Sequence, residues 1–200
     1  MKVAGKIALF LLCVVVFLFA AVGIRCTYHI PALVKYACYD SIISEMEFDC
    51  RLTAQSPTPA PAFELSDFSG KSVRFSEFKG KLLLISFWLV DCPPCKMEMP
   101  MFAELYKEYH SRGLEVISMT STKKWLAEGF VKNECSFPYQ ALHDPDGKIS
   151  KAYGFTSFPG SVLVDRCGQV VYSGSGYDPR QKAQIETSFR QAIEKVLVDK

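Results

Sequence analysis

Two cysteines near the middle of the chain have the spacing of a redox-active pair. The segment reads Asp91-Cys92-Pro93-Pro94-Cys95. Cysteines at this spacing at the start of a helix close a small disulfide ring, and the positive end of the helix dipole favours a thiolate on the first of them. The thiolate is the species that attacks another disulfide. The pair therefore predicts thiol–disulfide exchange.

A cysteine pair of this spacing is also half of a common kind of zinc site. A four-ligand zinc site needs a second pair of ligands, and the sequence contains no other CxxC and no HxxxH. The cysteine pair alone therefore gives little reason to expect a zinc site. We expect no metal ion and no cofactor.

A strongly apolar segment precedes the pair and an amphipathic segment follows it. Residues 81–89 (KLLLISFWL) are a nearly continuous apolar run, typical of a strand buried on both faces. Residues 95–112 have a helical composition, with one apolar stripe made of Phe102, Leu105, Tyr106 and Tyr109. This order places the first cysteine between a buried strand and a helix.

The rest of the domain alternates between strand and helix patterns. In chain order, the sequence predicts a strand at 114–119, a helix at 123–133, a short helix at 148–153, strands at 161–165 and 169–173, and a final helix at 179–197. In the helix at 123–133, Trp125, Leu126 and Phe130 are expected on one face. The alternation predicts an α/β fold with a mixed sheet.

Four segments resemble the thioredoxin superfamily and, within it, the membrane-anchored TlpA-like thiol–disulfide oxidoreductases. They are FELSDFSGKSVRFSEFKGK (63–81), LLLISFWLVDCPPCKMEMP (82–100), SFPYQALHDPDGKISKAYGF (136–155) and TSFPGSVLVDRCGQVV (156–171). The resemblance covers more than half of the chain. It implies a thioredoxin fold, a mixed central sheet flanked by helices, and reversible dithiol–disulfide exchange. By position, it implies that Cys92 is the attacking thiolate and Cys95 the resolving thiol.

Glu98 is the candidate for handling the proton of Cys95. Ser86 stands where many thioredoxins bury an acid below the cysteine pair, so that acid is missing here. Glu98 follows Cys95 by three residues, which places both on one face of a helix. The TlpA-like family matches in Cys-x-x-Cys-x-x-Glu-x-Pro. The alternative is that Glu98 is a solvated helix residue.

Ser157-Phe158-Pro159 is the second landmark of the resemblance. In thioredoxin-like proteins the corresponding proline is cis and faces the cysteine pair, where the preceding residue's backbone is presented to an incoming peptide. Phe158 and Pro159 are therefore candidate substrate-binding residues. Simple core packing is the alternative for Phe158.

The residues around Cys92 predict the direction of the reaction. Pro93 and Pro94 have no N–H, so two backbone donors that could stabilise the Cys92 thiolate are missing. Asp91 adds a like charge. Both effects disfavour the thiolate, which makes the dithiol the better reductant. We therefore predict a protein-disulfide reductase rather than an oxidant.

The N-terminal residues predict a membrane segment. Residues 7–24 (IALFLLCVVVFLFAAVGI) carry no charge and follow Lys2 and Lys6. The length suits a membrane-spanning anchor, and a cleaved signal peptide or a buried core helix are the alternatives. The lysines favour a cytoplasmic N-terminus, although Arg25 and Lys35 weaken this bias. We expect the domain on the periplasmic or extracytoplasmic side, where disulfides are permitted.

Composition divides the chain into four parts. We expect a membrane anchor or signal peptide at 1–25, a short helical cysteine-containing segment at 26–52, a proline-rich linker at 53–62 and a thioredoxin-like domain at 63–200. Beyond the first part the charges nearly balance, which argues against nucleic-acid binding. The expected partners are protein dithiol or disulfide substrates, an upstream electron donor and the membrane.

Two alternative functions use the same fold. A peroxiredoxin-like peroxidase has threonine three residues before the reactive cysteine, where this chain has Leu89. A copper-handling module is suggested by His143 and by methionines that follow the cysteine pair, but copper-assembly proteins of this fold have three residues between the cysteines. Those methionines, which fall on different helix faces, are Met97, Met99 and Met101.

Five further cysteines have no assigned role. Cys38–Cys50 and Cys135–Cys167 are candidate pairs, and Cys26 would then be left over. Sequence does not determine their connectivity.

Overall fold

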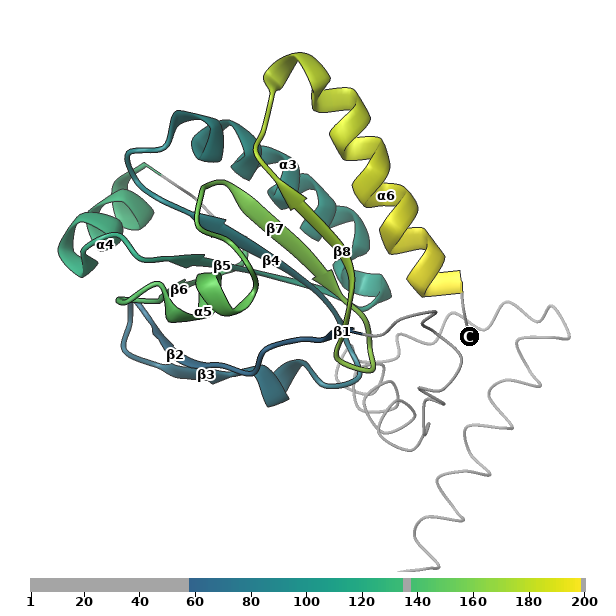
Figure 1. Cartoon of the computed structure of the whole chain (residues 1–200), viewed down its shortest axis with the longest axis horizontal. Helices are drawn as coiled ribbons and strands as arrows, with labels where there is room; N and C mark the ends of the chain where they lie inside the picture. Colours follow the sequence, from purple (N-terminus) through teal and green to yellow (C-terminus); the bar gives the residue numbers. More distant parts are fainter. Residues whose placement is uncertain (1–57, 135–137, 199–200) are drawn as a thin grey trace, which may run out of the picture. The chain divides into compact units, whose positions relative to one another are not determined.

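A computed structural model describes residues 58–134 and 138–198 of the chain (Figure 1). The expected anchor, the cysteine-containing segment and the first half of the expected linker lie outside these residues. Among the helices of 58–134 and 138–198, none is long and apolar enough to cross a membrane.

An eight-stranded mixed sheet forms the centre of the domain, in the order β1-β8-β7-β4-β5-β6-β2-β3. The strands are β1 (Thr58–Pro59), β2 (Glu64–Asp67), β3 (Ser72–Arg74), β4 (Leu82–Trp88), β5 (Leu114–Thr120), β6 (Gln140–His143), β7 (Gly160–Val164) and β8 (Gln169–Ser175). Strands β4, β5 and β6 are parallel, and the other pairings are antiparallel. The mixed sheet with a late hairpin, β7–β8, confirms the predicted architecture.

Helices cover both faces of the sheet (Figure 1). They are α3 (Pro93–Tyr109), α4 (Lys124–Asn133), α5 (Lys148–Ala152) and α6 (Lys182–Val198), with short 3-10 turns η1 (Phe75–Phe78), η2 (His110–Arg112) and η3 (Pro179–Gln181). Phe102 of α3 contacts Phe189 of α6, with ring centroids 5.4 Å apart, so these two helices share one face. Ile149 of α5 packs against the cluster on the other face.

The most apolar segment of the sequence becomes the central strand β4. All seven of its residues are buried, and successive side chains point to opposite faces of the sheet. Leu84 joins the apolar cluster of Phe102 and Phe189, whereas Ile85 joins a second cluster that includes Phe155. The prediction of a strand buried on both faces is confirmed.

The first strand begins within the segment expected as a linker. Thr58 and Pro59 pair with Val170 and Gln169 of β8, and the N–H of Ala60 donates to the Gly168 carbonyl at 2.9 Å. These contacts lie at the start of β8, which is the end of the sheet away from the cysteine pair. The short β2–β3 hairpin, at the other edge of the sheet, is an element that periodicity did not reveal.

The buried face of α4 differs from the prediction. Trp125 is 71% exposed and Leu126 39% exposed, whereas Ala127 and Phe130 are the buried residues of the helix. Phe130 packs on Trp88 of β4, with ring centroids 5.3 Å apart. The expected face was wrong because the inner face is the one that carries Phe130 onto Trp88, with Ala127 on the buried side, and not the one that carries the most apolar side chains.

Candidate active site

Cys92 and Cys95 are joined by a disulfide at the start of α3. Their Cα atoms lie 5.3 Å apart, and the Cys95 N–H donates to Cys92 Sγ at 3.3 Å. Cys92 is the N-cap residue of the helix, in an extended conformation. Cys95 is buried, whereas Cys92 is only partly buried. Of the two sulfurs, that of Cys92 is the one an incoming thiol or disulfide can reach.

Pro93 and Pro94 occupy the first two positions of α3. The first turn of a helix normally offers several free N–H groups, and proline is tolerated there because it removes only those unpaired donors. Here the removed donors are the two nearest to Cys92. The Cys95 N–H is therefore the first backbone donor of the helix, and it points to the Cys92 sulfur.

The Phe158–Pro159 bond is cis, as the resemblance implies. Phe158 is partly buried, and it packs against the apolar cluster that contains Trp88, Cys95 and Phe130. The loop before β7 therefore lies beside the disulfide. Phe158 contributes both to packing and to the surroundings of the cysteines, while its role toward substrate stays a prediction.

Glu98 is buried, with 3% of its surface exposed. Burial raises the pKa of its carboxyl group to about 8, because a charge is poorly solvated there. Among the described residues, none donates a hydrogen bond to this carboxyl. The solvated alternative is wrong for this residue. A carboxyl one helical turn after Cys95 is mostly protonated at neutral pH.

A row of buried serines crosses the sheet on the face that α3 covers. Ser86 of β4 pairs with Ser118 of β5 on one side and with Ser161 of β7 on the other. All three are buried. Ser86 points to the same face as Leu84, because alternate residues of a strand share a face. We call Ser86, Ser118 and Ser161 the serine row.

Tyr172 of β8 adds another hydroxyl near this row. Gly174 pairs with Ser161, and a Cβ on Gly174 would lie 3.1 Å from the Tyr172 hydroxyl. Burial, and then the charge of Glu98, raise the pKa of Tyr172. Tyr177 also has a raised pKa, from burial first, with a smaller contribution from Glu98. Glu98 thus lies within electrostatic range of two tyrosines, in a polar layer under α3.

Sequence reasoning missed most of this layer. Ser86 was noticed only as a missing acid, and no pattern marked Ser118, Ser161 or Tyr172. Their proximity comes from strand register, because residues from three strands must align side by side. No signal in a single sequence specifies that alignment.

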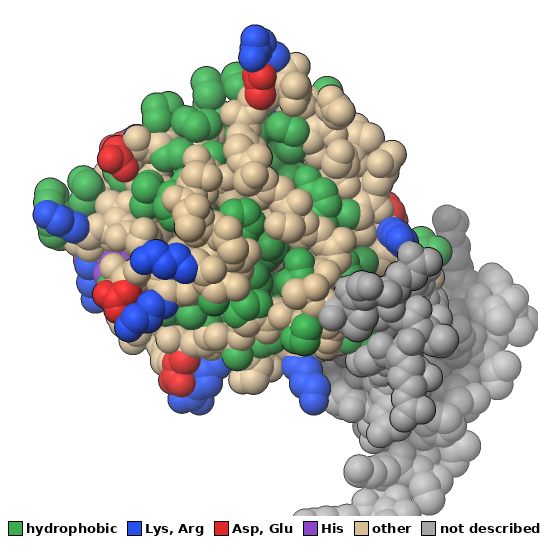
Figure 2. Space-filling view, in the orientation of Figure 1, with side chains coloured by type: hydrophobic (Ala, Val, Ile, Leu, Met, Phe, Trp, Pro, Cys, Tyr) green, Lys and Arg blue, Asp and Glu red, His purple; other side chains and the backbone are tan. Residues whose placement is uncertain are grey.

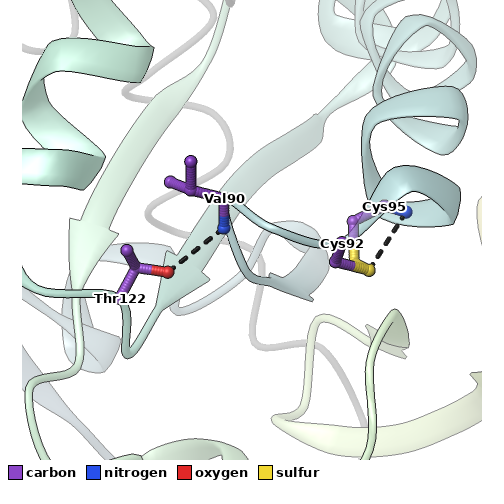
Figure 3. The surroundings of a disulfide bond; sticks show 4 residues. All are labelled: Val90, Cys92, Cys95 and Thr122. Carbon is purple, nitrogen blue, oxygen red and sulfur yellow. Dashed lines mark hydrogen bonds between the residues drawn. A yellow bond between two sulfur atoms is a disulfide. The ribbon is translucent and has the colours of Figure 1, made fainter.

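We call residues 89–92, between β4 and α3, the cysteine loop. A hydrogen bond joins this loop to the turn before α4 (Figure 3). The Val90 N–H donates to Thr122 Oγ1 at 3.1 Å. The Thr122 N–H donates to Thr120 Oγ1 at 3.2 Å, and His143 Nε2 lies 3.1 Å from the Thr122 carbonyl oxygen, to which it donates. Thr122 therefore holds Val90, two residues before Cys92, and is itself held by β5 and β6.

His143 and the three methionines lie in different surroundings. Its Nε2 is engaged with the Thr122 carbonyl, Met97 is exposed, and Met99 and Met101 are buried. In the parts of the chain that the structure describes, no group of three or more histidine, cysteine, aspartate or glutamate side chains is arranged to hold a metal ion.

Cys167 lies in the turn between β7 and β8, far along the sheet from Cys92, and it is disulfide-bonded. The remaining cysteines, Cys13, Cys26, Cys38, Cys50 and Cys135, lie outside the described residues. The predicted pairings among these cysteines stay predictions.

Comparisons with known proteins agree with this geometry. The Redoxin family matches residues 55–189, so the chain belongs to the Redoxin family. The chain is 35% identical over 134 residues to the thiol-disulfide oxidoreductase ResA of Bacillus thuringiensis subsp. konkukian (strain 97-27), covering 66% of this chain and 75% of that protein.

Solved structures show the same fold. The exposed lipoprotein thioredoxin of Streptococcus pneumoniae strain TIGR4 is 26% identical, with a TM-score of 0.55, over 64% of this chain and 99% of that one. A thiol:disulfide interchange protein of Chlorobium tepidum TLS, 22% identical, has a TM-score of 0.61 over 72% of this chain and 99% of that one. The thioredoxin-like α/β fold is confirmed.

Proposed function

We propose that this protein is an extracytoplasmic thiol–disulfide oxidoreductase that reduces disulfides in other proteins through Cys92 and Cys95. The observation that carries the proposal is the disulfide itself, with one accessible and one buried sulfur at the start of a helix. The relatives named as thiol–disulfide oxidoreductases support the same reaction.

The reaction transfers two electrons and two protons to the substrate. In the dithiol form, the Cys92 thiolate attacks a substrate disulfide, which forms a mixed disulfide and releases one substrate thiol. Cys95, once deprotonated, attacks Cys92 Sγ and releases the second thiol. The cycle leaves the Cys92–Cys95 disulfide seen in the structure. A dithiol donor must then reduce that disulfide.

Glu98 is suited to exchange the proton of Cys95. It is one turn away on the same helix, and its pKa of about 8 is close to that of an unperturbed thiol. Proton transfer is most efficient when the pKa values of donor and acceptor are similar. The deprotonated Glu98 takes the proton from Cys95 as that sulfur attacks, and releases it in the return step.

The start of α3 favours the reducing direction. With Pro93 and Pro94 in place, the Cys92 sulfur has only the Cys95 N–H as a backbone donor from the first helical positions. A thiolate with fewer donors is less stable, so the dithiol gives up electrons more readily. Replacing Pro94 by a residue with an N–H should make the protein a weaker reductant.

The uncharged segment at residues 7–24 supports a tether to the membrane. A domain attached in this way meets its substrates and its electron donor near the bilayer, on the side where disulfides persist. Phe158 and Pro159, beside the disulfide, are the residues proposed to contact the substrate chain.

Reduction of insulin disulfides by the full chain in detergent, with dithiothreitol as electron source, tests the proposal. The wild-type chain should accelerate insulin precipitation, and Cys92→Ser should abolish the acceleration. Cys95→Ser, reduced beforehand and mixed with insulin in the absence of dithiothreitol, should instead trap a mixed disulfide, visible as a gel band that disappears when a thiol reductant is added. Equal activity of wild type and Cys92→Ser would contradict the proposed reaction.

A further inference from the structure

Four consecutive exposed residues begin α4 and the turn before it. Lys123, Lys124, Trp125 and Leu126 are all exposed, and Trp125 keeps 71% of its surface in solvent. We call these four residues the α4 patch. An exposed tryptophan is uncommon, because its ring is among the most costly side chains to leave in water.

The α4 patch lies at the same end of the sheet as the disulfide. β4 and β5 are parallel, with Trp88 opposite Thr120, so the cysteine loop and the start of α4 both leave the sheet at this end. The Val90–Thr122 hydrogen bond of 3.1 Å joins the two segments directly (Figure 3). The α4 patch and the loop that carries Cys92 are therefore neighbouring segments at this end of the sheet.

Charge in the α4 patch is positive. Neither lysine of the patch makes an ion pair with a described residue, and Glu128, the nearest acid along the helix, pairs with Lys132 at 2.7 Å and interacts with Lys124 only at longer range. Figure 2 shows basic and hydrophobic side chains next to one another at the end of the molecule where α4 lies. Lysines beside tryptophan and leucine are the composition of a segment that lies at a membrane–water interface.

We propose that the α4 patch docks on an anionic lipid bilayer, with Trp125 and Leu126 at the headgroup level and the two lysines against lipid phosphates. Four residues are too small a surface for a stable protein complex, which buries about 800 Å² per partner. A tethered domain needs much less, because the tether keeps it at a millimolar effective concentration near the bilayer.

The distance to the bilayer suits this occupant. Residues 25–57 separate the uncharged segment from β1, and 33 residues would span on the order of 50 Å even at the 1.5 Å per residue of a helix. The inference rests on the proposed membrane tether. Docking would turn the Cys92 end of the domain toward the lipid surface, where a dithiol donor embedded in the membrane could reduce it.

Tryptophan fluorescence of the full chain reconstituted in vesicles tests the proposal. The chain has two tryptophans, of which Trp88 is buried and Trp125 is exposed, so Trp125 dominates any response to its surroundings. In vesicles of phosphatidylcholine with about one third phosphatidylglycerol, brominated acyl chains should quench Trp125 and its emission should shift to the blue. In phosphatidylcholine alone, both effects should be much weaker.

Matched variants distinguish binding through the α4 patch from nonspecific attraction between the protein's charge and the anionic lipid. Lys123→Glu with Lys124→Glu should weaken docking by roughly thirtyfold, about fivefold for each lysine, even before repulsion is added. Lys71→Glu with Lys79→Glu changes the charge equally at exposed lysines away from α4, and should leave quenching unchanged. Trp125→Phe gives the background from Trp88.

Several results would overturn the proposal. In the first, the chain floats with the vesicles, but brominated lipid quenches the wild-type fluorescence no more than it quenches that of Trp125→Phe. Another is slower insulin reduction by the Lys123→Glu, Lys124→Glu variant in lipid-free detergent, which would make the patch a protein-docking surface. A chain that does not insert into the vesicles would contradict the proposed tether and not the docking of the patch. Docking is then tested by flotation of the chain with preformed anionic vesicles, and a chain that does not float with them contradicts it.

Discussion

The two helices beside the disulfide break the usual distribution of polar and apolar groups in opposite ways. Under α3 a carboxyl group, Glu98, is buried with 3% of its surface exposed, whereas at the start of α4 the ring of Trp125 is 71% exposed. Charged residues are rarely buried without a partner, and large aromatic residues are rarely left in water. Both helices begin at the end of the sheet where the disulfide lies.

The comparison shows that the two exceptions have different consequences for the folded state. Burying Glu98 changes its chemistry, since the carboxyl keeps its proton to unusually high pH. Exposure of Trp125 changes no protonation or redox equilibrium, and it leaves an apolar surface available for docking. Variants under α3 should therefore alter stability and catalysis in solution, and variants of the α4 patch should alter neither.

The largest effect is expected in the pH dependence of stability. The folded pKa of Glu98, about 8, lies above the model-compound value of 4.5, so the folded protein binds a proton that the unfolded chain releases between these values. The free energy of unfolding of the oxidised protein should fall as pH rises through this window, by on the order of 4 kcal/mol between pH 5 and pH 9. Urea denaturation at pH 5, 7 and 9 measures it.

Glu98→Gln should remove most of that slope and be more stable than wild type at pH 9. Glu104→Gln is the matched control, because Glu104 is exposed on the same helix. An unchanged slope in Glu98→Gln would mean that another group causes the pH dependence.

Catalysis should respond to the same substitution by about tenfold to a hundredfold. Glutamine fills the space of Glu98 but cannot accept the Cys95 proton. The rate of insulin reduction at pH 7 should fall, and its dependence on pH around 8 should flatten. A slower rate with the wild-type pH profile would indicate a purely structural role for Glu98.

Thr122→Val should destabilise the fold by about 1 kcal/mol, because the Val90 N–H loses its acceptor. Thr122→Ser keeps the hydroxyl and should restore most of the stability. The equilibrium between the dithiol and disulfide forms, measured against glutathione, should shift in the valine variant and not in the serine variant. Equal behaviour of the two variants would show that the hydrogen bond does not position the cysteine loop.

Tyr172→Phe should have a smaller effect, about twofold on the rate at pH 7. Removing this hydroxyl makes the polar layer less favourable to the Glu98 carboxylate, so the midpoint of the pH–rate profile should move up by a few tenths of a pH unit. Tyr106→Phe, on the side of α3 toward His110, is the control and should leave the midpoint in place.

The smallest effect is expected for Trp125→Ala. An exposed ring contributes little to folding, so the free energy of unfolding should change by less than about 0.5 kcal/mol, and insulin reduction in solution should not change. Calorimetry of the two proteins provides the measurement. A loss above 2 kcal/mol would show that Trp125 is packed in solution, and the contrast between the two helices would then disappear.

Much of the fold could be predicted because its main elements carry strong local patterns. The run at residues 81–89 is apolar enough that β4 is the natural reading, and the spacing of Phe102, Leu105 and Tyr109 specifies the inner face of α3. The β2–β3 hairpin was not predicted because its strands have four and three residues, which is too short for a periodic signal.

The candidate site also contains residues that local sequence patterns predict and residues that they do not. Cys92, Cys95 and Glu98 are near one another in sequence, so helix geometry alone brings them together. Ser161, Tyr172 and Thr122 reach the cysteine region through strand pairing and loop contacts. The face of α4 could not be predicted because hydrophobicity ranks Trp125 above Ala127, whereas the buried face is set by the tertiary contact of Phe130 with Trp88.

The pairing of β1 with β8 fixes where the polypeptide enters the domain. Thr58 joins the sheet opposite Val170, at the far end from Cys92, so the whole length of the sheet separates the point of attachment from the reactive sulfur. A tether of the kind proposed would therefore hold the domain at the end of the sheet opposite to Cys92. The length of the sheet would then add to the distance from the attachment point at which the disulfide can meet a substrate.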